Sequence, residues 1–539
     1  MRRTAFPVVT ALGMALLLPQ QPAAATTVTT EQPPASGQIQ HLGPGQYTSD
    51  TQSFEVSESD ATVGIIGREH VVTAQAGGLA KPESAPASRA DMGVFGPGWK
   101  AEFLGGQLNR RLDQQSGAIV VTDLGVGESL RYDLTSSASL PGGGGVKQYQ
   151  ATDGSRLTET SRWDSSAGSM VSSVVETLGV DLSSTEPNDD TFTDEAGNPI
   201  PAADLKHTYT WKQAAPGSDT WRVTGVGSTA TGTSTIGYDP QGRVTTIAQP
   251  AAGEDPAQSL VIGYAAVTTA AGSSLGDVAG RAKEITVTSG ATNQTVARYA
   301  YDASGLLRTV TNPVESAAPA ATYTYDTTGR LSGLASPGNG EWTLSFPAQS
   351  AAPNAQPVGL ARPASESTFQ GGAGINDPGA VAPPASDLTS GEITDPQAYP
   401  RHCNTPASWM WYTKAGCAAW AAHYGWKKPY WKRLPSGHWV VGVNRDRCTR
   451  AADRPAGYNF IAACDMHDYG YGLIGNTYKG YRYYLDRYKK PAVDATFYVT
   501  LRDYTCSAYR NKAACRAIAY AYYKYYARHG NPRHGAIAT

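Results

Sequence analysis

From about residue 95 to residue 346, apolar and polar residues alternate with a period of two in short segments separated by Gly, Asn, Asp and Ser. Examples are Ala118–Asp123, Thr208–Trp211 and Ile285–Thr288. Because successive side chains of a strand point to opposite faces, this pattern predicts antiparallel strands. The preceding residues 26–94 form a polar segment with few apolar positions. We therefore expect a multidomain chain whose front region, 95–346, is all-β.

A Tyr-Asp-x-x-Gly pattern recurs in this region, with copies that begin at Tyr238, Tyr301 and Tyr325 and a degenerate copy at Tyr264. Asp can bond its own turn and Gly can supply a positive φ, so each copy predicts a strand, a turn and the next strand. Repetition of this kind indicates stacked supersecondary units. The pattern resembles the YD repeats of Rhs and teneurin-like proteins, whose strands wrap into a spiral sheet. The region is short for the closed shell that long Rhs proteins build, so neither encapsulation nor self-cleavage is expected; a β-rich spacer or wall-binding module is the alternative.

The composition changes twice after residue 346. Residues 347–400 are rich in Ala, Pro, Gly and Ser and predict a flexible linker. Residues 401–539 hold 19 of the 30 Tyr and six of the 11 Trp, with helical periodicity over Pro491–Thr505 and Ala513–Arg528. We expect an all-α C-terminal domain.

The N-terminus has the three parts of a secretory signal peptide: Arg2 and Arg3, the apolar run Ala5–Leu18, and the small residues Ala23–Ala25. The apolar run is short for a membrane anchor, which is the alternative. We expect cleavage of residues 1–25 and a secreted, extracellular protein.

All six cysteines follow residue 400, and an even number in an exported domain predicts disulfides. Fifteen connectivities are possible. Pairing of neighbours closes the shortest loops and predicts the bridges Cys403–Cys417, Cys448–Cys464 and Cys506–Cys515. A zinc site is the rival, but neither CxxC nor HExxH occurs.

The charge is divided unevenly. Residues 401–539 carry 22 Lys and Arg against 7 Asp and Glu, or +15, which leaves 22 against 39, or −17, for residues 1–400. A basic back region points to an anionic partner: lipid headgroups, a polyanion or its own acidic neighbour. The Trp-rich segment Trp409–Trp439 fits a bilayer interface or single-stranded nucleic acid, and a buried core is the plainer explanation.

Candidate chemistry lies in Cys464-Asp465-Met466-His467-Asp468. If this segment is helical, His467 and Asp468 point about 100° apart and serve different neighbours. A bridge from Cys448 to Cys464 would hold the Asp446 loop, with its carboxylate and a backbone carbonyl, beside the helix face that carries Asp468. Two carboxylates and a carbonyl are oxygen ligands that suit Ca²⁺.

His467 needs an acceptor that fixes its tautomer. Asp494 shares a helix face with Phe497, Tyr498 and Leu501, and a carboxylate on an apolar face requires a partner. A charge that stabilises the helix N-terminus is the alternative for Asp494. The carboxylates Asp486 and Asp503 are rivals with less apolar faces.

The Asp446-Arg447-Cys448 segment, the Cys464-x-x-His467-Asp468 segment and the downstream Asp494 and Cys506/Cys515 pair resemble the prokaryotic and fungal phospholipase A2 family. The resemblance implies a helical fold in which His467 is the general base and Asp494 orients it. It implies a Ca²⁺ cofactor bound by the side chains of Asp446 and Asp468 and the backbone carbonyl of Arg447. Tyr471 would support the site. The longer stretch between His467 and Asp494 and the additional Cys403/Cys417 pair depart from compact members.

These inferences favour a secreted, calcium-dependent phospholipase A2 that hydrolyses the sn-2 ester of glycerophospholipids with a water activated by His467. Such an enzyme would contact membranes peripherally, and no nucleic acid partner is expected. One alternative is an Rhs-like toxin with a different C-terminal activity, such as a nuclease. Another is a cell-surface binding protein with an inactive lipase domain. The oligomeric state does not follow from the sequence.

Overall fold

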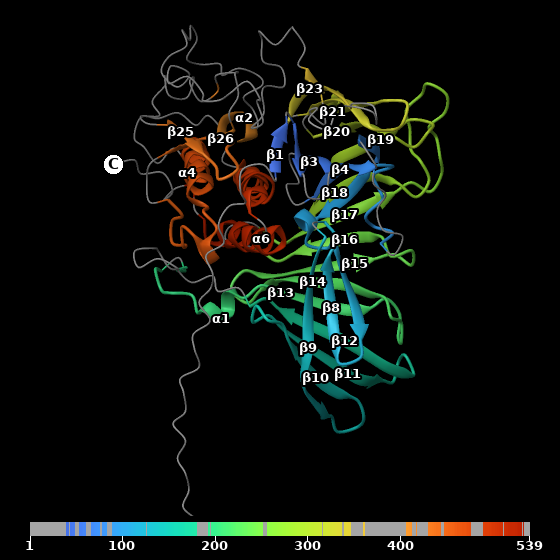
Figure 1. Ribbon diagram of the computed structural model, residues 1–539, viewed down its shortest axis with the longest axis vertical. Coiled ribbons are helices and arrows are strands. Elements are labelled where there is room, and N and C mark those ends of the chain that lie inside the picture. Colours follow the sequence, from blue (N-terminus) through green and yellow to red (C-terminus); the bar gives the residue numbers. More distant parts are fainter. Residues whose placement is uncertain are drawn as a thin grey trace, which may run out of the picture.

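The computed structural model describes most of the front region and the helices of the back region (Figure 1). The described residues are 39–42, 44–48, 53–60, 66–75, 78–82, 89–125, 127–179, 192–194, 196–251, 256–314, 316–336, 339–346, 359–361, 406–411, 417, 429–443, 447–475, 489–509, 511–530 and 532. The predicted signal peptide, residues 1–25, lies outside them.

The first sheet is antiparallel and occupies much of the segment that we described as polar. Its strands are β1 (Ile39–Leu42), β2 (Gly45–Thr48), β3 (Ser53–Ser59), β4 (Ile66–Gln75), β5 (Gly78–Pro82) and β6 (Trp99–Phe103). Strands β5 and β6 share one edge of β4: β6 pairs with Ile66–His70 and β5 with Val72–Gln75. A 3-10 turn, η1 (Leu104–Gly106), follows β6.

The following strands form antiparallel neighbours in sequence order and close into a barrel. They are β7 (Arg110–Gln115), β8 (Ala118–Asp123), β9 (Glu128–Ser139), β10 (Gly145–Gln150), β11 (Arg156–Asp164), β12 (Ser169–Thr177), β13 (Thr208–Gln213), β14 (Trp221–Ser228), β15 (Gly232–Tyr238), β16 (Val244–Gln249), β17 (Gln258–Tyr264), β18 (Ala282–Ser289), β19 (Thr292–Tyr301), β20 (Leu307–Thr311), β21 (Pro319–Tyr325), β22 (Leu331–Ser336), β23 (Gly340–Ser345) and β24 (Gly359–Ala361). A short helix, α1 (Ala202–Leu205), precedes β13.

A closed barrel was not expected from the sequence. Two features extend the sheet beyond what the repeats suggested. Long hairpins precede the first Tyr-Asp copy, and β24 pairs with β23 although it lies inside the predicted linker 347–400. The remainder of that linker lies outside the described residues.

Each Tyr-Asp copy forms the same turn. The turn glycines have positive φ: 80° at Gly242, 78° at Gly305 and 81° at Gly329. In each copy the glycine N–H donates to the carbonyl of the Asp, at 2.9 to 3.0 Å. The turn chemistry expected from the sequence is therefore present.

The structure adds a role for the tyrosines of these copies. The hydroxyl of Tyr238 donates to the Val223 carbonyl, and that of Tyr325 donates to the Leu307 carbonyl, each at 2.7 Å. The degenerate copy behaves in the same way, since Tyr264 donates to the Val244 carbonyl at 2.7 Å. The hydroxyl of each of these tyrosines therefore bonds the strand before its turn to the preceding strand of the barrel.

The first sheet packs against the inner side of the repeat strands. Trp99 Nε1 donates to the Tyr325 hydroxyl at 2.8 Å, and Arg68 donates to the Tyr323 hydroxyl at 3.3 Å. Arg68 is also paired with Asp60 at 3.1 Å. Because buried charges need partners, these contacts allow a charged strand to lie inside the protein.

The back region contains helices and one hairpin. The elements are α2 (Pro406–Met410), β25 (Pro429–Arg433), β26 (Trp439–Val443), η3 (Pro455–Gly457), α4 (Ile461–Gly475), α5 (Lys490–Val499), η5 (Thr500–Thr505), η6 (Cys506–Ala508) and α6 (Lys512–His529). The hairpin β25–β26 packs on α4, so "all-α" is not an accurate description of this region. Trp409 and Trp411, from the Trp-rich segment, belong to its core.

No helix among the described residues has the length and apolarity that a membrane crossing requires.

The helices lie against the strands rather than apart from them (Figure 1). Tyr498 donates to the Leu104 and Gly105 carbonyls at 3.3 and 3.2 Å. At the start of α6, the N–H groups of Lys512 and Ala513 face the Glu128 carboxylate at 3.2 and 3.3 Å. The basic back region therefore has an acidic neighbour within its own chain, which is one of the anionic partners considered above.

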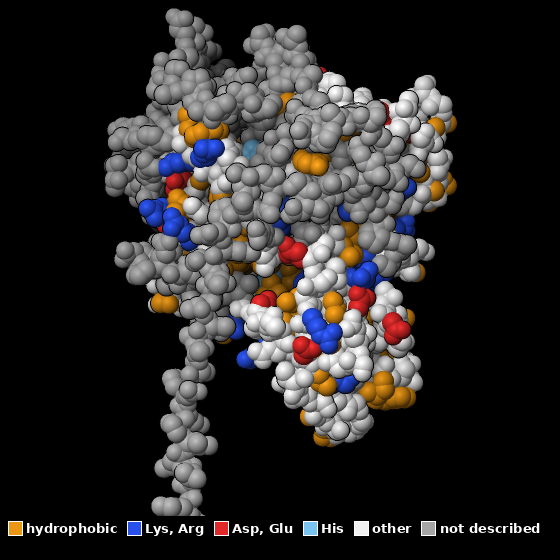
Figure 2. Space-filling view, viewed as in Figure 1, with side chains coloured by type: hydrophobic (Ala, Val, Ile, Leu, Met, Phe, Trp, Pro, Cys, Tyr) orange, Lys and Arg blue, Asp and Glu red, His pale blue; other side chains and the backbone are white. Residues whose placement is uncertain are grey.

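The end of the barrel away from the helices carries exposed apolar side chains. Figure 2 shows apolar side chains scattered among charged ones on the lower lobe, where Figure 1 places β9 to β12. Trp163 and Met170, which pair across β11 and β12, are 58% and 37% exposed.

Candidate active site

Three helices position the candidate catalytic side chains. Helix α4 carries His467 and Asp468, and α5 carries Asp494. Periodicity predicted the helix that carries Asp494, whereas the helix at His467 was an assumption. Near the start of α4, Asn459 accepts a hydrogen bond from the N–H of Ile461 at 3.2 Å, as a capping residue does. The close packing of α4 and α6 on α5 brings together residues that are distant in sequence.

His467 and Asp494 meet between α4 and α5. His467 Nε2 lies 2.7 Å from Asp494 Oδ1, and both side chains are almost completely buried. An ionised carboxylate can only accept a hydrogen bond, so Nε2 carries the proton of the neutral imidazole. The lone pair that remains is on Nδ1, which identifies the nitrogen that can accept a proton.

Asp494 receives donors on both oxygens. Tyr471 donates to Oδ1 at 2.8 Å, and the Lys490 ammonium donates to Oδ2 at 2.7 Å. Burial favours a higher pKa for this carboxyl group, but Lys490 and His467 outweigh it and lower the pKa to about 2. Asp494 is therefore a carboxylate at neutral pH.

The imidazole of His467 is enclosed by aromatic rings. Its centroid lies 4.1 Å from that of Tyr471, 4.6 Å from that of Phe497 and 5.1 Å from that of Tyr526. Burial lowers the pKa of His467 below its usual range, and the Lys490 charge lowers it further, while the bond to Asp494 acts in the opposite direction. The imidazole is therefore neutral at neutral pH, as a base must be.

Of the two other carboxylates considered from the sequence, the structure describes Asp503. Asp503 is paired with the neighbouring Arg502, at 2.6 and 2.7 Å. Asp486 lies outside the described residues. Among the described residues, Asp494 is the carboxylate that the structure places against His467.

Two of the predicted disulfides are confirmed, Cys448–Cys464 and Cys506–Cys515. Cys417 is also disulfide-bonded and buried. Cys403, its predicted partner, lies outside the described residues.

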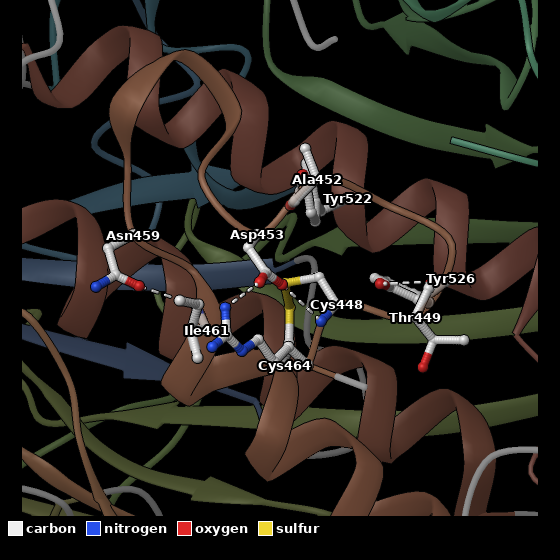
Figure 3. The surroundings of a disulfide bond; sticks show 10 residues. Cys448, Thr449, Ala452, Asp453, Asn459, Ile461, Cys464, Tyr522 and Tyr526 are labelled. Carbon is white, nitrogen blue, oxygen red and sulfur yellow. Dashed lines mark hydrogen bonds and ion pairs between the residues drawn. A yellow bond between two sulfur atoms is a disulfide. The ribbon is translucent and has the colours of Figure 1, made fainter. Parts of the chain in front are cut away.

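The Cys448–Cys464 bridge fastens the Arg447 loop to α4 (Figure 3). Asp453 holds the same loop: Oδ1 accepts from the N–H of Cys448 at 3.1 Å, and Oδ2 accepts from the Arg447 guanidinium at 2.9 Å. Arg447 has a φ of 61°, a left-handed conformation that is uncommon for a residue with a side chain. Strained residues of this kind concentrate at functional sites, so the loop is a candidate for ligand binding.

The predicted calcium ligands are only partly described. Asp468 is buried on α4, and Arg447 is in the loop that the disulfide fastens to this helix. Asp446 lies outside the described residues, and among those described no three His, Cys, Asp or Glu residues cluster closely enough to hold a metal ion. The described donors, a carboxylate and a backbone carbonyl, are of the hard oxygen type that Ca²⁺ binds.

Sequence reasoning missed one residue of the site, Lys490, and gave Tyr471 a supporting role without a partner. The signal for Lys490 was its position four residues before Asp494, because residues at this spacing are neighbours on a helix. No comparable signal linked Tyr471 to Asp494, since that contact joins two helices.

A buried His–Asp pair with the Nε2 proton held by the carboxylate leaves Nδ1 as an acceptor, an arrangement that can serve as a general base. The class of protein comes from comparison with known families. Residues 431–530 match the family model described as "Prokaryotic phospholipase A2". The predicted C-terminal phospholipase A2 domain is thereby confirmed.

A curated relative points the same way. The chain is 35% identical over 83 residues to "Secretory phospholipase A2" of Arthroderma benhamiae (strain ATCC MYA-4681 / CBS 112371). This similarity covers 14% of the present chain and 52% of the relative, so the chain spans about half of the relative's length.

Proposed function

We propose that this protein is a secreted, calcium-dependent phospholipase A2 that releases the sn-2 fatty acid of glycerophospholipids. The observation that carries the proposal is the 2.7 Å contact between the buried side chains of His467 and Asp494. The family match over residues 431–530 supports it independently.

His467 acts as the general base in this proposal. Asp494 holds the Nε2 proton, so Nδ1 removes a proton from the attacking water as that water approaches the ester carbonyl. The imidazolium formed in this step is stabilised by the adjacent carboxylate. Nδ1 then returns the proton to the leaving glycerol oxygen, so no covalent acyl-enzyme is needed.

Calcium would be held by the side chains of Asp446 and Asp468 and by the Arg447 carbonyl. When bound, it supplies a positive charge that polarises the ester carbonyl and attracts the phosphate of the lipid. The bridge Cys448–Cys464 joins the Arg447 loop to α4, which supports a role for this loop in holding the ion beside Asp468.

The remaining parts of the chain have proposed roles in delivery. Residues 1–25 direct export, and the Tyr-Asp region 95–346 carries the catalytic domain of residues 401–539, with residues 347–400 as the connection. The substrate lies at a membrane surface, which the protein contacts peripherally. The secretory relative supports an extracellular location.

The test uses the full chain and phosphatidylcholine vesicles with a label in the sn-2 acyl chain. We expect calcium-dependent release of the labelled fatty acid, abolished by a chelator and by His467→Ala. His438→Asn is the matched control, because His438 is buried in the same region but bonds to Ser436 in the β25–β26 turn.

Three results would contradict the proposal. Fatty acid release that persists in the presence of a chelator would show that the reaction does not need calcium. Release by His467→Ala would show that His467 is not the general base. Cleavage of RNA by the same preparation, without fatty acid release, favours the nuclease alternative.

A further inference from the structure

Lys490 is the least expected charge at the candidate site. It is the first residue of α5, where the helix dipole repels a cation. Its side chain is nonetheless only 13% exposed. A largely covered lysine at an unfavourable helix end requires compensation from tertiary contacts.

The contacts of the Lys490 ammonium supply that compensation. Nζ lies 2.7 Å from Asp494 Oδ2, 3.0 Å from the Ala527 carbonyl and 3.3 Å from the Tyr526 carbonyl. An ammonium group has three donors, and this arrangement offers one acceptor for each. Two of the acceptors belong to the last turn of α6, where the helix dipole favours a cation.

Lys490 thereby joins three parts of the site. It neutralises the Asp494 oxygen that His467 does not use, and it fixes the last turn of α6 against α5. That turn carries Tyr526, whose ring packs on the imidazole of His467. Without the ammonium, Asp494 Oδ2 would lose its charged partner in a buried environment, and only the bonds at Oδ1 would hold the carboxylate against Nε2.

We propose that Lys490 is a positioning residue: it holds the Asp494 carboxylate and the end of α6 so that His467 keeps its proton on Nε2. The inference rests on the proposed function for its kinetic consequence. The tautomer of His467 in the resting protein does not depend on turnover.

The experiment compares Lys490→Met with the wild-type full chain in calcium buffer. Methionine keeps an apolar stem of similar length and removes the ammonium. Lys490→Arg restores a cation with a different shape. The control is Lys512→Met, which changes a half-buried lysine at the first position of α6, away from His467.

Two measurements are made on each protein. The first is kcat and KM on a dispersed short-chain phosphatidylcholine. For Lys490→Met we expect kcat to fall about 10- to 100-fold with KM within about twofold, and Lys490→Arg to recover part of kcat. The second is the ¹⁵N spectrum of labelled histidine, with the His467 signals identified by their loss in His467→Gln.

The spectrum separates positioning from a general structural role. We expect a single Nε2–H tautomer of His467 in the wild type and in Lys512→Met, and a mixture of tautomers in Lys490→Met. Should Lys490→Met fail to fold, Lys490→Gln takes its place in both measurements.

The proposal is overturned if the His467 tautomer is unchanged in the neutral variant, or if kcat stays within twofold of the wild type. Failure of the proposed function looks different. In that case the wild type itself releases no fatty acid, while the spectra still decide whether Lys490 fixes the tautomer.

Discussion

Gly105 lies where the strands meet the helices, and its replacement by alanine tests whether the two parts of the chain pack in solution as they do in the structure. Its φ is 62°, so any side chain there is strained, at about 1 to 2 kcal/mol. A Cβ at this position would also overlap the Tyr498 hydroxyl and would lie 2.6 Å from the ring carbon Cζ. Overpacking of a buried contact adds about 1 to 3 kcal/mol. The expected total loss is about 2 to 5 kcal/mol.

Gly117 provides the matched control. Its φ is 74°, but a Cβ there would meet nothing within 4 Å. Gly117→Ala should therefore cost only the backbone strain, about 1 to 2 kcal/mol. The assay is urea unfolding followed by near-ultraviolet circular dichroism, because the helical region contains 19 of the 30 tyrosines.

A second variant assigns the excess cost to Tyr498. In a Tyr498→Ala background the overlap is absent, so Gly105→Ala should cost no more than Gly117→Ala does. The reasoning is refuted if Gly105→Ala and Gly117→Ala destabilise the wild-type protein equally, since Tyr498 would then not occupy its position against Gly105.

Three other predictions follow from named contacts. Asp494→Asn should lower kcat about 10³- to 10⁴-fold, since an amide can stabilise the wrong His467 tautomer; a loss below tenfold in fatty acid release would argue against an orienting role. Burial raises the pKa of Glu69 well above its usual range, with Glu55 and Glu102 contributing. The folded state therefore retains a proton that the unfolded state releases, and stability is lost as pH rises above the ordinary Glu pKa of about 4.3. Glu69→Gln should raise the urea concentration at the unfolding midpoint, relative to wild type, near pH ~8 and not near pH ~4.5. A difference between variant and wild type that is the same at both pH values would contradict this prediction. Replacement of Cys448 and Cys464 by alanine should cost about 2 to 5 kcal/mol in urea unfolding and weaken calcium binding by calorimetry. Unchanged calcium affinity would separate the Arg447 loop from the metal.

Turns, helices and short-range disulfides could be predicted from the sequence, because they depend on residues that are neighbours in the chain. The Tyr-Asp turns follow from an Asp that bonds its own turn and a Gly with positive φ, and the structure has both. The helix that carries Asp494 follows from apolar periodicity. Short cysteine spacing predicted Cys448–Cys464 and Cys506–Cys515 correctly.

Other features could not be predicted from the sequence, because they depend on which distant segments of the chain pack together. Closure of the barrel depends on pairings beyond the repeats, including β24 in a segment whose composition predicted a linker. The contact of Tyr498 with Gly105 joins residues almost 400 positions apart. No periodicity encodes such a pairing.

From the sequence it was possible to predict the strands of the repeats, the helices α5 and α6, two disulfides and a C-terminal phospholipase A2 domain with His467 as its candidate base. The sequence favoured Asp494 over Asp503, but only the tertiary structure shows that Asp494 lies against His467, because this contact depends on how α5 lies against α4. It also decided that Lys490 and Tyr471 converge on the same carboxylate, which places α4, α5 and the end of α6 in one hydrogen-bonded group. The physical reason is that side-chain type and spacing fix local geometry, whereas the partner of a buried charge is selected by the packing of whole helices.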